Sequence, residues 1–583
     1  MKRNLLLAFL LTIAMVCGAQ TPWNGTVADN YDGGDGTTGN PYQIATAEQL
    51  ALLAQQTNNG TGGDACYILT NDIVLNNGDS LLWTPIGNVG MFTGVFDGNN
   101  HIIIGLYEDG NKVSGLFAST ENATIKNTIL KNATVLEYEQ AYMYSAIGGV
   151  LIGKAKNTNV LDCSVDGLIE IFSSKSSGGL VGQYEVDVNG NDTVFIKNCM
   201  NFAMVAENEC TGGMAGKTIV NNGNLVIDNC VNNGYISGWS FSGGMVGMVG
   251  DGAFIIKNCD NYGEIVSEAT AGGMVGQGGL SCSITNCFNH ESGKITGGMN
   301  TGGIIGTAIT TVMSCCGNAG LITGINDDEI MVGGISGADG TIYNCFNRGD
   351  LTAVFTGSNP LLIQMGGISS TPPNDEYVRN VYNAGTIIKP TNTNIQSKWY
   401  GYIVPAIMND TVISNCYWSG DELVTTYVYN LSISDWVHLP ISSHFSQGAT
   451  ATSWTLRNAQ YGTYDLIEAL NAGAMGQCVW VEDTEGINGG LPIPRDSHYV
   501  EVQEQPVTDL MVYPNPTNGI LTIETVCTPS LQGQTEYRIM NLMGQIVQSG
   551  RLGGENQQID VSSLSGGMYF ITVGGTTVKF MKQ

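Results

Sequence analysis

Apolar and polar residues alternate along most of the chain in short runs of strand length, and these runs recur with a nearly fixed period. The clearest copy extends from Gly243 to Ile265. It has the form G-G-φ-φ-G, a short gap and then φ-x-N-C-x-N-x-G-x-I, where φ is apolar. Glycine doublets open successive copies from Gly148 to Gly366, and neighbouring doublets lie 29 to 34 residues apart. A period in this range indicates a stacked repeat architecture.

Each repeat contains three short apolar runs separated by Gly and Asn, with neither the length nor the periodicity for a helix of ordinary length. Three strands per repeat, each paired with its equivalent in the next repeat, predict an all-β fold. We expect a parallel β-helix (β-solenoid), and the crossover rule predicts a right-handed coil. Neighbouring coils would then lie ~4.8 Å apart.

Two asparagine positions recur along the repeats and would stack into ladders. Asparagine tolerates left-handed backbone angles, and its side-chain amide can bond to the amides above and below it. We therefore interpret both positions as structural. The Asn before the Cys recurs at Asn198, Asn229, Asn258, Asn286, Asn344 and Asn380, and the Asn after it at Asn201, Asn232, Asn261, Asn289, Asn318, Asn347 and Asn383.

Cysteine follows the same period, and the chain has 15 cysteines in total. A free cysteine behaves as a small buried hydrophobic residue, so we expect an inward column of thiols. Disulfides are the alternative, with Cys315–Cys316 and Cys282–Cys287 as candidate pairs. Zinc is not expected, because no C-x-x-C pair and no histidine accompany the column. The predicted column is Cys199, Cys230, Cys259, Cys287, Cys315, Cys345 and Cys416.

Charge and the first residues indicate an exported protein. The net charge is −29, and loss of Lys2 and Arg3 with a leader would make it −31. Such an acidic surface argues against nucleic acid or an anionic membrane as a partner. Residues 1–19 have a basic start, an apolar core and small final residues, which predict a signal peptide cleaved between Ala19 and Gln20. No later segment has the apolar length of a transmembrane span.

Both ends of the repeat region carry cap signals. Thr46 to Gln49 forms a capping box at the start of a short helix, which would cover the open first coil. A second short helix is predicted from Tyr464 to Ala472, and Trp480 would help to close the body. The predicted division is 1–19 signal peptide, 20–82 N-terminal cap, 83–420 repeats, 421–498 C-terminal cap, 499–507 linker and 508–583 separate β domain.

Three segments are distinctive: Gly39-Asn40-Pro41-Tyr42-Gln43-Ile44, Phe96-Asp97-Gly98-Asn99 and Gly178-Gly179-Leu180-Val181-Gly182. They resemble the GLUG-motif proteins of bacterial surfaces, and the resemblance covers about residues 20–420. Other copies depart from the motif, as at Gly366-Gly367-Ile368-Ser369-Ser370. The resemblance implies a β-helical stalk or an adhesin-like surface module.

The chain ends with an ordered set of motifs, which starts at Tyr513-Pro514-Asn515-Pro516 and finishes at Lys579 to Lys582. These residues resemble the type IX secretion sorting domain of the Bacteroidota. This resemblance implies export by the type IX secretion machinery and a location at the outer membrane or cell surface. Gln545 departs from the pattern, since a basic residue is usual there. A small β-sandwich of unrelated purpose is the alternative. The matching residues are Tyr513, Pro514, Asn515, Pro516, Gly519, Gly544, Gly567, Tyr569, Lys579 and Lys582.

No sequence motif for catalysis is present. Gly34, Gly36 and Gly39 match the dinucleotide-binding pattern G-x-G-x-x-G, but Asn40-Pro41 follows where such a site needs a helix, so no cofactor is expected. The five histidines share no pattern, and H-E-x-x-H, G-x-S-x-G and P-loop sequences are absent. Asp32 and Asp35 are candidate calcium ligands, although a turn explains them as well. A carboxylate pair assembled across coils would make a polysaccharide lyase or glycoside hydrolase, which is the alternative function.

The favoured function is a non-catalytic adhesin or binding stalk, whose partner would be an extracellular glycan or a host protein. A solenoid face suits an extended ligand. Five aromatic residues near the corners are either interior or available for such binding. They are Tyr235, Trp239, Phe241, Tyr262 and Phe288.

Three short segments resemble the Asp-Ser/Thr-apolar acceptor site for O-glycans on exported proteins of the same bacterial group. Their hydroxyl residues are Ser80, Thr193 and Thr411. Thr193 and Thr411 are predicted to lie in loops, where a bulky glycan would not break a ladder.

Overall fold

A computed structural model of the 583-residue chain shows two compact units, Met1–Asp496 and Ser497–Gln583. The structure describes residues 21–78, 81–137, 146–190, 192–250, 252–371, 377–391, 394–407, 412–418, 425–430, 435–440, 460–461, 464–474, 478–483, 488–496, 510–513, 517, 519–525, 535–540, 546–552, 557–564, 567–573 and 576–582. The predicted leader, with Ala19 and Gln20, lies outside these residues. Within them, no helix is long and apolar enough to cross a membrane.

The first unit begins with a helix against the first coil, as the capping box predicts. The helix α2 (Ala47–Asn58) starts at Thr46, whose hydroxyl accepts from the Gln49 backbone N–H while the Gln49 side chain accepts from the Thr46 N–H. Leu50 and Leu53 are fully buried in the main core. The strands β1 (Tyr42–Ile44), β2 (Cys66–Leu69) and β3 (Ile73–Val74) flank the helix and begin the parallel stacking.

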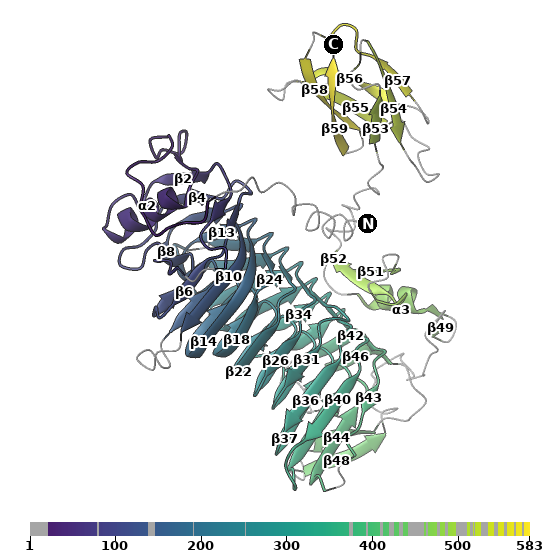
Figure 1. The fold of residues 1–583 in the computed structure, drawn as a ribbon. Coiled ribbons are helices and arrows are strands. Elements are labelled where there is room, and N and C mark those ends of the chain that lie inside the picture. The colour runs from purple at the N-terminus through teal and green to yellow at the C-terminus, as the bar shows by residue number, and fades with distance from the viewer. Residues whose placement is uncertain are drawn as a thin grey trace. The chain divides into compact units, whose positions relative to one another are not determined.

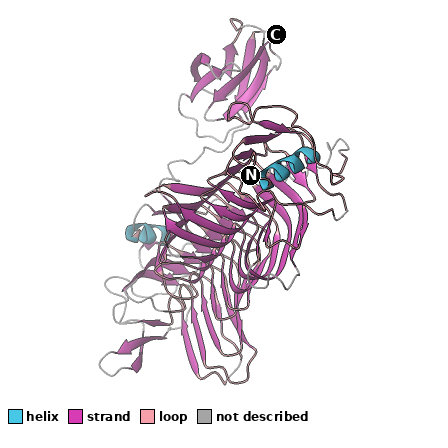
Figure 2. Cartoon of the chain, turned by 90° about the vertical axis from the view of Figure 1, so that its left-hand side faces the viewer, coloured by secondary structure: helices cyan, strands magenta, loops and turns pink. Residues whose placement is uncertain are grey.

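The body is a parallel β-solenoid, which confirms the predicted fold class (Figure 1, Figure 2). Each strand pairs with its equivalent in the next coil, so that Ile227, Ile256 and Ile284 are partners in register. The strands before the cysteine corner are β4 (Val95–Asp97), β9 (Thr124–Lys126), β13 (Asn159–Leu161), β16 (Thr193–Lys197), β20 (Asn224–Asp228), β24 (Ala253–Lys257), β29 (Ser281–Thr285), β34 (Val312–Ser314), β38 (Thr341–Tyr343), β42 (Tyr377–Asn383) and β46 (Val412–Trp418).

The coil continues through several short strands after the cysteine corner. Next to the corner lie β5 (Ile102–Ile104), β10 (Ile129–Glu137), β14 (Ser164–Gly178), β17 (Met200–Asn201), β21 (Val231–Asn232), β25 (Asp260–Asn261), β30 (Phe288–Asn289), β35 (Gly317–Asn318) and β39 (Phe346–Asn347). Then follow β6 (Tyr107–Asp109), β18 (Met204–Gly212), β22 (Ile236–Gly243), β26 (Ile265–Ser267), β31 (Ile295–Gly297), β36 (Ile322–Asn326), β40 (Leu351–Phe355) and β43 (Ile387–Ile388).

The glycine doublets end the next strands and lead into a separate sheet. The strands that approach the doublets are β7 (Val113–Ser114), β11 (Ile147–Gly149), β27 (Thr270–Gly272), β32 (Asn300–Gly302), β37 (Glu329–Gly333), β41 (Leu362–Gly366) and β44 (Ser397–Gly401). A seven-stranded sheet closes the coils with β8 (Phe117–Glu121), β12 (Ile152–Lys156), β15 (Val181–Asp187), β19 (Ala215–Asn222), β23 (Val246–Val249), β28 (Val275–Gln277) and β33 (Ile305–Thr307).

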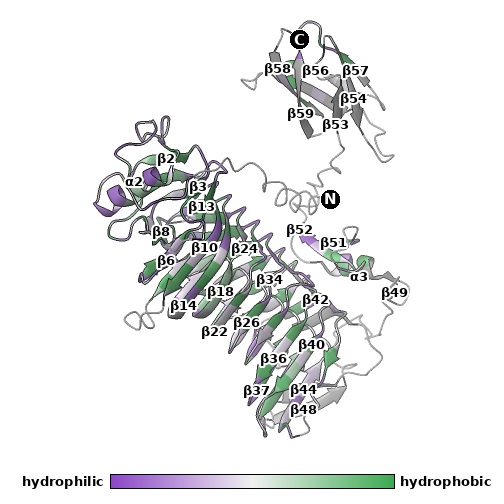
Figure 3. Ribbon diagram, in the orientation of Figure 1, coloured by the Kyte–Doolittle hydropathy of each residue, from purple (hydrophilic) through white to green (hydrophobic). Residues whose placement is uncertain are grey.

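The predicted three strands per repeat become up to five short ones, as in the coil β24 to β28. The glycine doublets and the corner glycines lie between these short strands, where the chain turns. Only glycine fits there, because the backbone of a neighbouring segment is too close to leave room for a Cβ. A Cβ on Gly243, for example, would lie 2.2 Å from the Val246 carbonyl oxygen. Hydrophobic stretches still recur at equivalent places of neighbouring strands (Figure 3). The isoleucines before the corner, such as Ile196, Ile227 and Ile256, are fully buried.

The asparagine after the cysteine forms a buried ladder through the solenoid, as the repeat predicts. Asn232 Nδ2 donates to Asn261 Oδ1 at 2.8 Å, and Asn261 Nδ2 donates to Asn289 Oδ1 at 2.7 Å. The same contact joins successive coils from Asn201 to Asn383. Asn261 Nδ2 also donates to its own Gly263 carbonyl at 2.9 Å. Each amide therefore fixes both a turn and the register of the next coil.

The asparagine before the cysteine also bonds between coils, as predicted: Asn229 Nδ2 donates to Asn198 Oδ1 at 2.8 Å and Asn286 Nδ2 to Asn258 Oδ1 at 2.9 Å. Its backbone is left-handed. Asn229, Asn258 and Asn286 have φ of +54°, +58° and +53°. Asparagine adopts this conformation more readily than most residues, because its short polar side chain bonds locally. The position makes the corner at which the chain turns from one strand to the next.

A helix and a hairpin at the end of the first unit pack against the side of the coils. They are α3 (Leu466–Gly473) and the antiparallel pair β51 (Cys478–Val481) and β52 (Ile493–Asp496). The helix matches the predicted one from Tyr464 to Ala472. We call residues 466–496 the strap. Leu470, Trp480, Leu491 and Ile493 of the strap form one buried cluster with an aromatic column, which consists of Phe288, Phe346, Tyr382 and Tyr417.

The strap differs from the predicted C-terminal cap in where it packs. Its aromatic partners belong to several coils and directly follow the inward cysteine position, so they face outward. The strap therefore covers a flank of the solenoid (beside β34 and β42 in Figure 1), and we name this side the aromatic flank. Further strands near the chain's end of this unit are β45 (Ala406–Ile407), β47 (Thr425–Asn430), β48 (Asp435–Pro440), β49 (Gln460–Tyr461) and β50 (Tyr464–Asp465).

The second unit is a small two-sheet β domain, as the alternating pattern predicts. One sheet contains β53 (Leu510–Tyr513), β54 (Ile520–Thr525) and β57 (Gln557–Asp560), and the other contains β55 (Thr535–Met540), β56 (Ile546–Leu552), β58 (Gly567–Val573) and β59 (Thr576–Lys582). Leu521, Ile539, Val561 and Ile571 form its core.

We predict that Asn261→Ala lowers the free energy of unfolding by about 2–6 kcal/mol, because two buried amides lose a partner at ~1–3 kcal/mol each. Chemical denaturation of the mature chain measures the change. Asn229→Gly is the matched control: Asn229 is exposed and glycine accepts its left-handed φ, so the loss should stay below about 1 kcal/mol. Equal losses of unfolding free energy in the two variants would show that the buried ladder does not stabilise the fold more than an exposed asparagine does.

Candidate functional site

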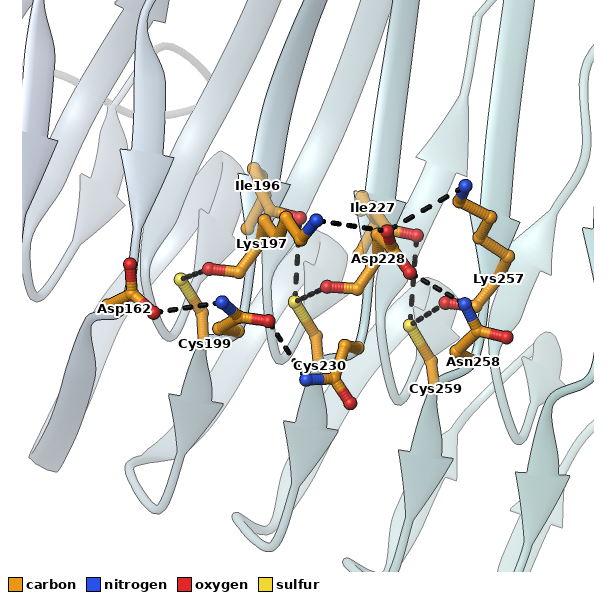
Figure 4. A network of polar contacts seen from close by, with 12 residues as sticks. Asp162, Ile196, Lys197, Cys199, Ile227, Asp228, Cys230, Lys257, Asn258 and Cys259 are labelled. Carbon is orange, nitrogen blue, oxygen red and sulfur yellow. Dashed lines mark hydrogen bonds and ion pairs between the residues drawn. The ribbon is translucent and has the colours of Figure 1, made fainter. Parts of the chain in front are cut away.

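The cysteine corner carries thiols and charged side chains that recur from coil to coil, which makes it a candidate site. Cys199, Cys230 and Cys259 are fully buried in successive coils (Figure 4). Cys230 Sγ donates to the Asp228 carbonyl at 3.4 Å and to the Ile196 carbonyl of the preceding coil at 3.5 Å. All the described cysteines are free thiols. Burial raises the pKa of Cys199, Cys230 and Cys259 well above the usual thiol value. These three thiols therefore act as unreactive packing, because the thiolate is the nucleophile.

The structure corrects one member of the predicted column: Cys316, not Cys315, points inward. Cys316 Sγ donates to Ser314 O at 3.1 Å and to Ile284 O at 3.4 Å, as the other column thiols do. Cys315 takes the left-handed corner position with φ of +53°. The spacing to Asn318 carries the signal, since each ladder asparagine lies two residues after its column cysteine. Val381 fills the column between Cys345 and Cys416.

A charged group lies on the outer side of the same corner. Asp228 Oδ2 is 3.7 Å from both Lys197 Nζ and Lys257 Nζ, and its Oδ1 accepts from Asn258 Nδ2 at 2.7 Å (Figure 4). The Asp228 side chain is only 10% exposed. Both carboxylate oxygens therefore bind neighbouring coils, which gives the carboxylate a structural role and leaves it poorly placed for proton transfer.

The five aromatic candidates lie outside the main buried core. Tyr235, Trp239 and Phe241 are half-buried near one corner. The half-buried Tyr262 stacks on His290 with ring centroids 3.9 Å apart, and His290 Nε2 lies 2.7 Å from Asp260 Oδ1.

Phe288 differs from the other four aromatic residues, because it belongs to the aromatic flank. It is 5% exposed, and the Arg495 guanidinium lies 5.5 Å from its ring centroid. The strap therefore occupies the surface that Phe288 would otherwise offer to a ligand.

The two candidate calcium ligands are in the N-terminal cap. Asp35 Oδ1 accepts from the Thr37 backbone N–H at 3.0 Å and from the Thr37 hydroxyl at 2.7 Å. These bonds lower the pKa of the Asp35 carboxyl. The turn explanation therefore accounts for Asp35, while Asp32 is exposed. Among the residues that the structure describes, no group of three or more His, Cys, Asp or Glu side chains could hold a metal ion.

The three hydroxyl residues predicted for O-glycans have different outcomes. Ser80 and Thr411 lie outside the described residues. Thr193 begins strand β16, where it pairs in register with Asn224, and Asn224 Nδ2 lies 3.5 Å from its Oγ1. The expected loop location of Thr193 is therefore wrong, because the parallel stacking extends to this residue.

Several residues of the predicted sorting motif have structural roles in the second unit. Tyr513 ends β53, Gly567 and Tyr569 lie on β58, and Lys579 and Lys582 lie on β59. Tyr569 is in the core, and Lys582 pairs with Thr517. The Gly519 N–H donates to Thr517 Oγ1 at 3.3 Å. Pro514, Asn515, Pro516 and Gly544 lie outside the described residues.

Comparison with known proteins identifies the end of the chain. Residues 511–583 match the secretion system C-terminal sorting domain. No curated protein matches the chain. A crystal structure of a candidate immunoglobulin A1 protease from Bacteroides ovatus is similar, with 18% identity and a TM-score of 0.36, over 56% of this chain and 87% of that one. At this level the similarity carries no argument about activity. The chain thus has a type IX sorting domain, which directs secretion through that system.

The raised thiol pKa values predict a loss of stability at alkaline pH. A thiol that stays protonated in the fold but ionises when unfolded contributes stability that is complete below its unfolded pKa of ~8.5 and declines as the pH rises above it. The decline should be about 1.4 kcal/mol per pH unit for each such thiol. Denaturation midpoints of the reduced chain between pH 7 and 9.5 measure it. A Cys199→Ala, Cys230→Ala, Cys259→Ala variant should have a flatter profile, and an identical slope would contradict burial of these thiols.

Proposed function

We propose that the protein is a cell-surface-attached, non-catalytic β-solenoid that acts as an adhesin or binding stalk. The sorting domain at residues 511–583 is the observation that carries this proposal. The resemblance of residues 20–420 to GLUG-motif surface proteins of the Bacteroidota supports it, as does the predicted signal peptide. The role of the repeated side chains gives further support, because they bind neighbouring coils.

The binding face would be the outside of the coils. Equivalent outward positions recur ~4.8 Å apart along the axis, which suits an extended ligand that contacts several coils. We propose an extracellular glycan or a host protein as that ligand. The interior asparagines are not available to a ligand, since Asn232 and Asn261 are buried and bond to each other and to the carbonyls of their own turns.

Deletion of residues 508–583 should abolish surface delivery and leave the solenoid folded. The deleted residues belong to a separate compact unit, so the contacts of the first unit stay intact. Fractionation of cells that express the full or the truncated chain measures delivery, and protease resistance measures folding. Accumulation of the truncated chain on the cell surface would refute the sorting role.

A second assay tests the absence of catalysis. The purified mature chain should bind members of a glycan array or host matrix proteins without changing them. Release of shortened or unsaturated polysaccharide products would instead establish the hydrolase or lyase alternative.

A further inference from the structure

The described end of the first unit does not lie at the last coil. Strand β52 begins near Tyr382, whose hydroxyl donates to the Pro492 carbonyl at 2.6 Å. Three residues later, Arg495 lies over the ring of Phe288. The strap thus runs backwards along the aromatic flank, from later coils towards earlier ones.

The register of the coils gives the length of this return. Phe288, Gly317, Phe346, Tyr382 and Tyr417 occupy equivalent positions in consecutive coils. Arg495 therefore lies four coil steps before Tyr417, or roughly 19 Å at ~4.8 Å per coil. The same position continues towards the N-terminus through Asp260, Val231, Met200 and Ser164. The last described residues of the first unit thus lie near the middle of the solenoid.

Specific packing holds the strap on the flank. The Phe346 and Tyr382 rings stack with centroids 5.4 Å apart, and Trp480 lies against Tyr382 at 5.6 Å. Gly317 is required here, because a Cβ would lie 2.1 Å from the Phe346 ring. Trp480 is 1% exposed and Ile493 is 2% exposed.

Polar contacts hold the two strands of the strap together and fix them against Tyr382. Asp483 Oδ2 accepts from the backbone N–H groups of Asn488 and Gly490 at 2.8 and 2.9 Å. The fully buried Asn488 side chain in turn donates to the Tyr382 hydroxyl and to the Pro492 carbonyl. A mere spacer to the next domain would need neither a buried amide nor a buried tryptophan.

We propose that the strap moves the attachment point of the chain from the last coil to the middle of the aromatic flank. The surface-attached body then lies side-on, with this flank towards the cell and both ends of the solenoid at similar distances from it. This inference rests on the proposed surface attachment. It also assigns the ligand-binding role to the remaining faces, since the flank is covered by the strap and directed to the cell.

The first test measures the exit point in the purified, full mature chain. Spin labels on unnatural amino acids, which avoid the many thiols, replace Asp496 and either Glu291 or Gln396. Asp496–Glu291 should give a short, narrow distance distribution, and Asp496–Gln396 a longer one. Trp480→Ser with Ile493→Ser should lengthen and broaden the first distribution. Glu482→Ala, an exposed change on the same hairpin, is the control and should leave it unaltered. A broad Asp496–Glu291 distribution in the unaltered chain would overturn the proposal.

The second test measures orientation on cells. Fluorophores at Gln55 on α2 and at Gln396 near the last coils transfer energy to a lipophilic acceptor in the outer membrane. The two labels should transfer to a similar extent, and the Trp480→Ser, Ile493→Ser variant should raise transfer from Gln396 and lower it from Gln55. Much stronger transfer from Gln396 in the unaltered chain would overturn side-on attachment. Loss of surface retention would instead refute the proposed function, while the distances in the purified chain would still decide where the chain leaves the body.

Discussion

Each buried amide from Asn201 to Asn383 bonds to the amide of the next coil, and this ladder sets the register on which the other columns depend. A shift of one residue would move every inward side chain outward, because strand side chains alternate with a period of two. It would also separate each amide from its partners in the neighbouring coils, at ~1–3 kcal/mol for each lost pairing. Stacking of identical positions is therefore strongly favoured over other pairings.

The remaining columns follow from this register. The left-handed asparagines make the corner, the thiols fill the interior beside it, and Asp228 joins three coils on the outside. The aromatic flank arises in the same way, because outward residues on consecutive coils come close enough to stack. Among the described residues, this last column is covered by the strap, which lies outside the repeats.

The sequence was sufficient for features that repeat. The asparagine ladders, the capped helix α2 and the two-sheet domain could be predicted, since each shows a period or a local signal. Cys315 was misplaced because two adjacent cysteines satisfy the period equally, and only the distance to Asn318 separates them. The contact of Asn488 with Tyr382, 106 residues apart, has no periodic signature. The burial of Phe288 beneath Arg495 could not be predicted from the sequence for the same reason. The strand that begins at Thr193, paired with Asn224, was also not predicted.

Hydrogen exchange of the reduced, secreted chain, followed by mass spectrometry, tests the ladder most directly. Backbone N–H groups that are hydrogen-bonded between stacked coils exchange only when the neighbouring coils separate. The peptides that contain Asn232, Asn261 and Asn289 should therefore exchange together, and far more slowly than the exposed segment 88–91. Exchange around Asn261 as fast as in that segment would contradict a solenoid held in register by its buried amides.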